Sequence, residues 1–184
     1  GFPAGFDAED GVRYITNTQD GAYLVVGYTH SDTAGGIDGL IMKVDDSGTL
    51  MWSKKYGGAN TDILNGAYAL SDGGYVLSGW SNPGPTGSAD FWLVKVDGNG
   101  VKQWDKYFGF SGWDSAGSAI IETEDGGYIL AGTSWDEGAG NQGKALIYKL
   151  DQNGNIQWNK KISNTNFTTG VEAIIKATDG GFIL

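Results

Sequence analysis

Cysteine is absent from the sequence of 184 residues, and proline (three residues) and histidine (one residue) are scarce. Without cysteine, disulfides and thiolate chemistry are excluded. No apolar run approaches the roughly 18 residues that a membrane-spanning helix needs, so we expect no membrane span. Lysine and arginine number 12 against 22 acidic residues, which gives a net charge of −10. Because binding to phosphates requires a basic surface, we expect no nucleic-acid partner.

Glycine and aromatic residues are abundant instead, with 32 Gly, 7 Trp, 9 Tyr and 7 Phe. This composition favours short strands joined by tight turns, and the chain has no evident helical pattern. It also argues against disorder, since disordered segments are poor in aromatic and β-branched residues. The composition therefore indicates an all-β protein.

Two motifs recur along the chain with the same period. The first is Asp-Gly followed by a small, an aromatic and an aliphatic residue; its copies start at positions 20, 72, 125 and 179, which are 52, 53 and 54 residues apart. The second is Lys, an aliphatic residue and Asp, followed by Trp; it spans 43–52, 95–104 and 149–158. Two motifs in phase over nearly the whole chain indicate a structural unit repeated about every 53 residues.

Each unit is predicted to contain four strands. In the second unit we expect them at about 64–70, 75–80, 91–96 and 101–108. An Asp-Gly turn joins the first and second strands, and an Asn-Gly turn joins the third and fourth. Both are strong hairpin signals, because glycine accepts the positive φ that such turns need. The unit is therefore expected to be an antiparallel meander.

The apolar pattern of these strands favours a β-propeller over a sandwich. Segments 75–77 and 91–94 are apolar at successive positions, as expected for a sheet covered on both faces. A β-solenoid is the main competitor, but its coils are usually shorter and its parallel stacking does not suit hairpin turns. We therefore predict an all-β chain forming a segment of a β-propeller built from four-stranded antiparallel blades. The blades are expected at about 11–57, 63–108 and 116–163, with the start of a fourth at 171–184.

Three and a half blades do not close a ring, since propellers close with about four to eight. We therefore expect either a piece of a larger ring, completed by missing blades of the same protein, or half of a ring completed by a second copy of the chain.

The third unit carries a full copy of both motifs: Asp-Gly-Gly-Tyr-Ile-Leu-Ala-Gly-Thr at 125–133 and Lys-Leu-Asp-Gln-Asn-Gly-Asn-Ile-Gln-Trp at 149–158. These segments resemble the propeller repeats of large secreted and cell-surface proteins of bacteria and archaea. The second segment is also similar to the tryptophan motif of quinoprotein-like propellers. The resemblance implies a propeller fold and a secreted or cell-surface location; it implies no particular activity, because propellers host many functions.

Residues that recur in every unit are expected to build the fold. We assign this structural role to the repeated tryptophans and lysines, which are Trp52, Trp104, Trp158, Lys43, Lys95 and Lys149. The turns at Asp97 and Asp151 have only a faint likeness to a calcium loop, since their glycines stand at position 4 and an EF-hand requires glycine at position 6. Asx-turn hydrogen bonding explains them more simply, so we expect no metal.

Residues that differ between units are the candidates for binding. The variable connections are expected at 29–37, 81–89, 134–143, 57–62 and 109–115. In or beside them lie Trp80, Trp113, Trp135 and Asp136, which we take as candidate ligand-binding residues. Tryptophans beside carboxylates and amides can hold a sugar by stacking and hydrogen bonding, so the expected partner is a glycan or a surface protein. The alternative is that Trp80 and Trp113 fill gaps between blades.

Catalysis has little support in the sequence, and we assign no catalytic residue and no cofactor. Adjacency of His30 and Ser31 does not form a catalytic triad, and adjacent carboxyls such as Asp136 and Glu137 do not face each other across a sugar. The favoured function is a non-enzymatic scaffold, adhesion or ligand-binding module. The alternatives are a fragment of a carbohydrate-active or quinoprotein-type enzyme whose catalytic residues lie outside this chain, and an assembly protein that closes a ring with a second chain.

Overall fold

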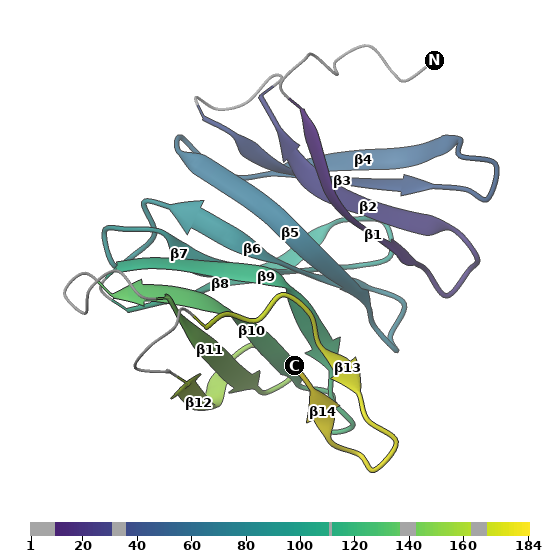
Figure 1. Ribbon diagram of the computed structural model, residues 1–184. Coiled ribbons are helices and arrows are strands. Elements are labelled where there is room, and N and C mark those ends of the chain that lie inside the picture. The colour runs from purple at the N-terminus through teal and green to yellow at the C-terminus, as the bar shows by residue number, and fades with distance from the viewer. Residues whose placement is uncertain (1–9, 31–35, 111, 137–142, 163–168) are drawn as a thin grey trace.

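The computed structural model describes residues 10–30, 36–110, 112–136, 143–162 and 169–184. These residues form antiparallel β-sheets and no helix (Figure 1). Each sheet is a meander, with its strands in chain order from one edge to the other. The predicted all-β class is therefore confirmed, as are four-stranded antiparallel sheets.

Three sheets have four strands each, and a short pair of strands follows them. The first sheet contains β1 (Gly11–Asn17), β2 (Tyr23–Thr29), β3 (Asp38–Val44) and β4 (Leu50–Tyr56). The second contains β5 (Thr61–Ala69), β6 (Tyr75–Asn82), β7 (Asp90–Val96) and β8 (Lys102–Phe108). The third contains β9 (Gly112–Glu122), β10 (Tyr128–Asp136), β11 (Gly143–Leu150) and β12 (Ile156–Ile162). The last pair is β13 (Ile175–Lys176) and β14 (Phe182–Ile183).

The first and second strands of the later sheets are longer than the sequence predicted. In the third sheet β9 and β10 continue pairing to Trp113 and Trp135, which lie opposite each other. In the second sheet Asp62 pairs with Ser81 in the same way. The interpretation of Trp113 and Trp135 as loop residues is therefore wrong. They stand on paired strands, because the hairpin ladder extends beyond the apolar run that marked each strand in the sequence.

The turn between the first and second strands is the same in all four units. In the second unit, the amide of Leu70 donates to the carbonyl of Gly74 over 2.9 Å, and Gly73 has a φ of 83°. Only glycine adopts this conformation without strain, which explains the Asp-Gly motif. The turn aspartate then accepts from the repeated lysine on the third strand. The three Lys Nζ–Asp carboxylate distances are 2.6 Å for Lys43–Asp20, 2.9 Å for Lys95–Asp72 and 2.9 Å for Lys149–Asp125.

The turn between the third and fourth strands is an Asx turn, as the sequence predicted. Oδ1 of Asp97 accepts from the amides of Asn99 (2.9 Å) and Val101 (2.8 Å). Oδ1 of Asp151 accepts from Asn153 and Asn155 in the same way, at 2.8 Å each. The bonds from its own turn, led by the amide of Asn155, lower the pKa of Asp151. The carboxylate oxygens therefore serve the turn.

The repeated tryptophans pack between neighbouring sheets. The ring of Trp52 on β4 lies 6.4 Å from the ring of Tyr75 on β6, and Trp104 on β8 lies 6.1 Å from Tyr128 on β10. Around Trp104 is a buried apolar cluster from the second and third sheets. The cluster consists of Leu70, Val76, Phe91, Leu93, Phe108, Ile120, Tyr128, Leu130, Leu146, Tyr148 and Leu150. Both faces of the second sheet are therefore covered, which accounts for its uninterrupted apolar strands.

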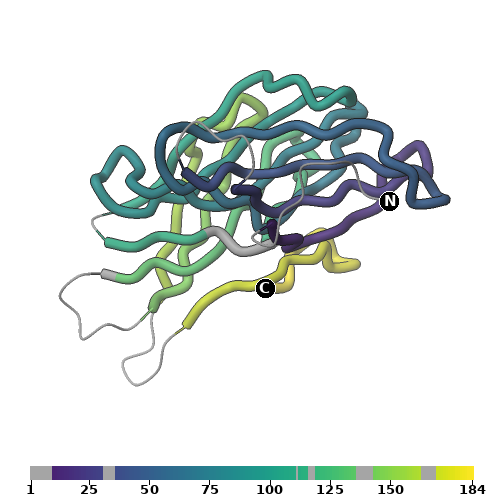
Figure 2. Tube along the Cα trace, turned by 90° about the horizontal axis from the view of Figure 1, so that it is seen from above, coloured from purple at the N-terminus to yellow at the C-terminus, as the bar shows by residue number. Residues whose placement is uncertain are grey.

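The first strand of each sheet lies on a shared inner edge. Strands β1, β5 and β9 run side by side, and the remaining strands of each sheet lie farther out (Figure 1). Seen from above, β1 and the segment that leads to β13 lie on the same side of the molecule (Figure 2). This inner edge brings residues from all four units toward one another.

Candidate functional site

A β-bulge recurs on the inner edge and sets the direction of one side chain in each of the first two sheets. In β1 the partners Val12 and Tyr14 flank an extra residue, Arg13, and in β5 Leu64 and Gly66 flank Asn65. A bulged residue leaves the ladder and its side chain is re-aimed. Arg13 and Asn65 thus hold the same place in two sheets and carry different side chains.

The bulges depend on glycine in the neighbouring strand. A Cβ on Gly79 of β6 would stand 1.8 Å from the carbonyl oxygen of Ile63, and one on Gly27 of β2 would stand 1.9 Å from that of Gly11. No side chain fits at such a distance, so the glycine lets the bulged strand approach.

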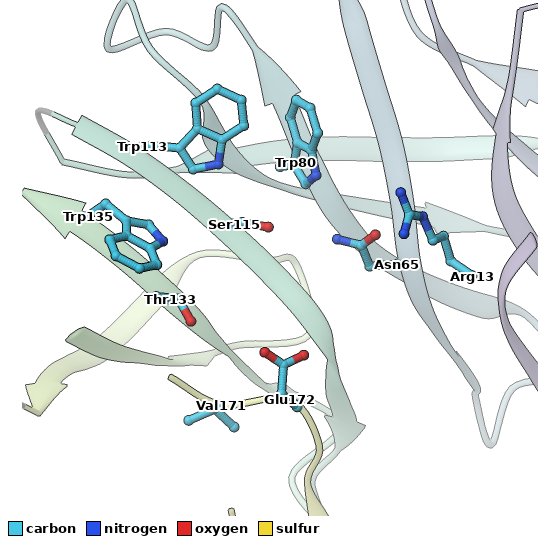
Figure 3. Close-up of a pocket in the computed structure, with 9 residues that line it drawn as sticks. All are labelled: Arg13, Asn65, Trp80, Trp113, Ser115, Thr133, Trp135, Val171 and Glu172. Carbon is cyan, nitrogen blue, oxygen red and sulfur yellow. The ribbon is translucent and has the colours of Figure 1, made fainter. Parts of the chain in front are cut away.

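The bulged residues line a pocket of about 540 Å³ on the inner edge (Figure 3). This volume lies within the range of small-ligand sites. The pocket is formed by β1, β5, β6, β9, β10 and the segment before β13. Its lining comprises Arg13, Asn65, Trp80, Trp113, Ser115, Thr133, Trp135, Val171 and Glu172.

Three tryptophans form one side of this pocket. The rings of Trp80 and Trp113, from neighbouring sheets, lie 5.0 Å apart at an angle of 55°. Trp113 is 42% exposed, whereas Trp80 and Trp135 are half-buried. The structure therefore brings together the three tryptophans that the sequence singled out. Trp80 and Trp113 contact each other across two neighbouring sheets, and both line the pocket.

Asp136, the fourth candidate, is the last residue of β10 and pairs with Gly112. Its side chain lies outside what the structure describes. Sequence reasoning missed the polar residues of the pocket, above all Arg13, Asn65 and Glu172. For Arg13 and Asn65 a signal was available. Glycine recurs in the second strand, at Gly27 and Gly79, and it marks the bulge on the strand opposite.

The polar lining combines a cation, a carboxylate, an amide and two hydroxyls. In Figure 3 the guanidinium of Arg13 and the amide of Asn65 lie across the pocket from the indole of Trp135, and the carboxylate of Glu172 points inward. The Arg13 guanidinium carbon also lies 5.1 Å from the ring centre of Tyr28, which favours a fixed position for it. Such a lining can bind a polar ligand through both donors and acceptors while the indoles cover an apolar face.

Buried aspartates fix the connections that enter the inner strands. Asp62 Oδ2 accepts from the amide of Gly58 at 2.9 Å, and Asp114 Oδ2 accepts from that of Phe110 at 2.6 Å. Burial raises the pKa of Asp114. Asp62 therefore holds the connection that leads into β5, and Asp114 holds the one that leads into β9 beside Trp113.

The part of the chain that the structure describes contains no group of three histidine, aspartate or glutamate side chains arranged to hold a metal ion. Within that same part, no helix has the length and apolar character needed to cross a bilayer.

No family model matches the sequence, and no curated protein matches it. A solved structure, that of a protein of unknown function from Bacteroides caccae, is similar with a TM-score of 0.60 and 12% sequence identity. The similarity covers 96% of this chain and 53% of the other, so the chain spans about half the length of that protein. At this identity the likeness concerns the fold alone.

Proposed function

We propose that this chain is a segment of a β-propeller that binds a glycan, without transforming it, in the tryptophan-lined pocket of its inner edge. The observation that carries the proposal is the meeting of Trp80, Trp113 and Trp135 around one pocket of about 540 Å³. Indole faces pack on the C–H faces of sugar rings, and the surrounding donors and acceptors match hydroxyl groups.

The propeller part of the proposal rests on the repeat and on the arrangement of the sheets. Sheets of four strands in chain order, each with its first strand on a common inner edge, are what neighbouring blades of a ring require. The resemblance of the repeats to secreted and cell-surface proteins supports an extracellular setting, in which glycans are abundant ligands.

Binding without catalysis is favoured by the composition of the pocket. Glu172 is the one carboxylate among its described lining residues. Hydrolysis of a glycosidic bond by the usual mechanism needs two carboxyls on opposite sides of the bond.

The test is a printed array of bacterial, plant and animal glycans, followed by fluorescence titration of any glycan retained. We expect Trp113→Ala to weaken binding about tenfold or more and to leave the melting temperature nearly unchanged, because this side chain is 42% exposed. Trp158→Ala is the matched control, since Trp158 is 43% exposed but lies on β12, away from the pocket lining. Absence of any retained glycan, or equal loss of binding in both variants, would contradict the proposal.

A further inference from the structure

Arg13 is the one cationic side chain among the described residues that line the tryptophan pocket. It stands on the bulge of β1, and its side chain is exposed. Within the described part of the chain, its guanidinium forms no ion pair with a carboxylate and no hydrogen bond. Its positive charge and its N–H donors are therefore available to a ligand in the pocket.

The ring of Tyr28 holds this guanidinium in place. The guanidinium carbon lies over the ring, 5.1 Å from its centre. A guanidinium on an aromatic face keeps the N–H donors at its rim accessible. Tyr28 pairs with Gly11, where an added Cβ would lie 2.4 Å from the tyrosine ring, so the glycine leaves room for that ring. The ring of His30 contacts Tyr28 edge-on, with 6.0 Å between the ring centres. The cation is thus positioned before any ligand binds.

Glu172 carries the opposite charge in the same lining, but its situation differs from that of Arg13. Glu172 already has an interaction partner within the protein, and so has Asn65. A positively charged group on the ligand would have to compete with the partner of Glu172, whereas a negatively charged group would meet a guanidinium that has no ion pair. The pocket therefore favours a ligand with a negative charge.

We propose that the glycan bound in this pocket carries a carboxylate, and that Arg13 is the residue that selects it. The inference rests on the function proposed above and names the chemical class of its ligand. In an acidic sugar the carboxylate is attached at the rim of the ring, so a ring packed on an indole can present it sideways to a cation. Figure 3 shows the guanidinium of Arg13 across the pocket from the indole of Trp135, as this mode of binding requires.

A carboxylate suits Arg13 better than a neutral hydroxyl does. The planar guanidinium donates two parallel N–H bonds to the two oxygens of a carboxylate, and such charge-assisted bonds are stronger than neutral ones. Removing the charge from the ligand while keeping its ring and hydroxyls should therefore remove most of the contribution of Arg13.

The test adds oligogalacturonate, oligomannuronate and sialyllactose to the array, beside neutral and amino glycans. Each acidic glycan that the array retains is then titrated against the whole chain together with its methyl ester, which keeps the ring and the linkage and removes the charge. We expect the acid to bind about tenfold or more tightly than its ester. Retention of the uronates or of sialyllactose distinguishes the two sources of the carboxylate.

Variants of the chain show whether Arg13 causes this preference. Arg13→Gln should bring the affinity for the acid down to that for the ester. Arg13→Lys should keep part of the preference, because lysine retains the charge and loses the paired donors. Lys160→Gln is the matched control. It makes the same charge change on an exposed side chain of β12 outside the pocket lining, so the full preference should remain.

The outcomes separate this inference from the function on which it rests. Equal binding of acids and esters would overturn the inference and leave glycan binding in place. The same holds for a preference that Arg13→Gln and Lys160→Gln reduce equally, and for an array that retains neutral or amino glycans but no acidic one. An array that retains no glycan at all would contradict the proposed function, and the inference with it.

Discussion

Trp104 and Trp158 hold the same place in successive units but lie in different surroundings. Trp104 is packed between the second and third sheets, against Gly154 and Tyr128. Trp158 is 43% exposed, because within the described residues no complete sheet follows the third. The repeat therefore determines which residue stands at a position, whereas the neighbouring sheet determines how much that residue contributes to stability.

The largest expected effect is at the covered junction. Trp104→Ala should lower the free energy of unfolding by about 3 kcal/mol, the lower end for deleting a large buried aromatic side chain, because Trp104 is only partly buried. Trp158→Ala should change it by about 0.5 kcal/mol, as is usual for exposed positions. Urea denaturation of both variants measures the difference. Equal losses of unfolding free energy would show that covering by the neighbouring sheet does not increase the contribution of the tryptophan to stability.

The next effect contrasts Gly79 on β6 with Gly58 in the connection before β5. Gly79→Ala places a Cβ 1.8 Å from the carbonyl oxygen of Ile63 and should cost about 2 kcal/mol, because the β5 bulge must move. It should also weaken ligand binding, since Asn65 on the same bulge reaches the pocket.

Gly58→Ala is the control for this substitution. An added Cβ there meets no atom within 4 Å, so its melting temperature should stay within a degree or two of the parent. If thermal denaturation shows equal stability for both variants, the bulge does not need the glycine and the account of the inner edge is wrong.

The smallest effect concerns the lysine–aspartate pairs, which are the same in all three sheets. The hydrogen bond from Lys43 lowers the pKa of Asp20 to about 2, and that from Lys95 lowers the pKa of Asp72. A carboxyl whose pKa is lowered in the folded state stabilises the fold at pH values above its ordinary pKa of about 3.8. The fold loses this stabilisation as the pH falls toward 2.

Asp72→Asn should therefore lower the free energy of unfolding at pH 7 by about 0.5 kcal/mol, since Asp72 is largely solvated and the pair is screened. At pH 2 to 3 the variant and the parent should be closer in stability than at pH 7. Urea denaturation across this range is the measurement. A difference that grows as the pH falls would contradict the assigned ion pair.

Much of the fold could be predicted because its signals are local. The Asp-Gly turns specify hairpins through the positive φ of Gly73 and its equivalents, and the apolar runs specify strands covered on both faces. The repeat then assigns the same structure to each unit. The ends of β9 and β10 could not be predicted, because pairing between Trp113 and Trp135 continues past the apolar run and depends on the partner strand.

The candidate site was predicted only in part, for a related reason. The tryptophans could be found because Trp80, Trp113 and Trp135 break the repeat and are chemically conspicuous. Arg13 is marked only indirectly, by Gly27 on the neighbouring strand, and Glu172 is not marked at all. Nothing in the sequence shows that these two residues, near opposite ends of the chain, line one pocket.

The sequence by itself thus determined the unit, its four strands, its turns and the residues that recur between sheets, because each follows from spacing and backbone preference within about 53 residues. The tertiary structure decided which side chains meet. Bulges at Arg13 and Asn65 turn those side chains toward the inner edge, and the stacking of sheets brings them opposite Glu172 and the tryptophans. It also decided that Trp104 is covered and Trp158 is not, since burial depends on a neighbouring sheet and not on the residue itself.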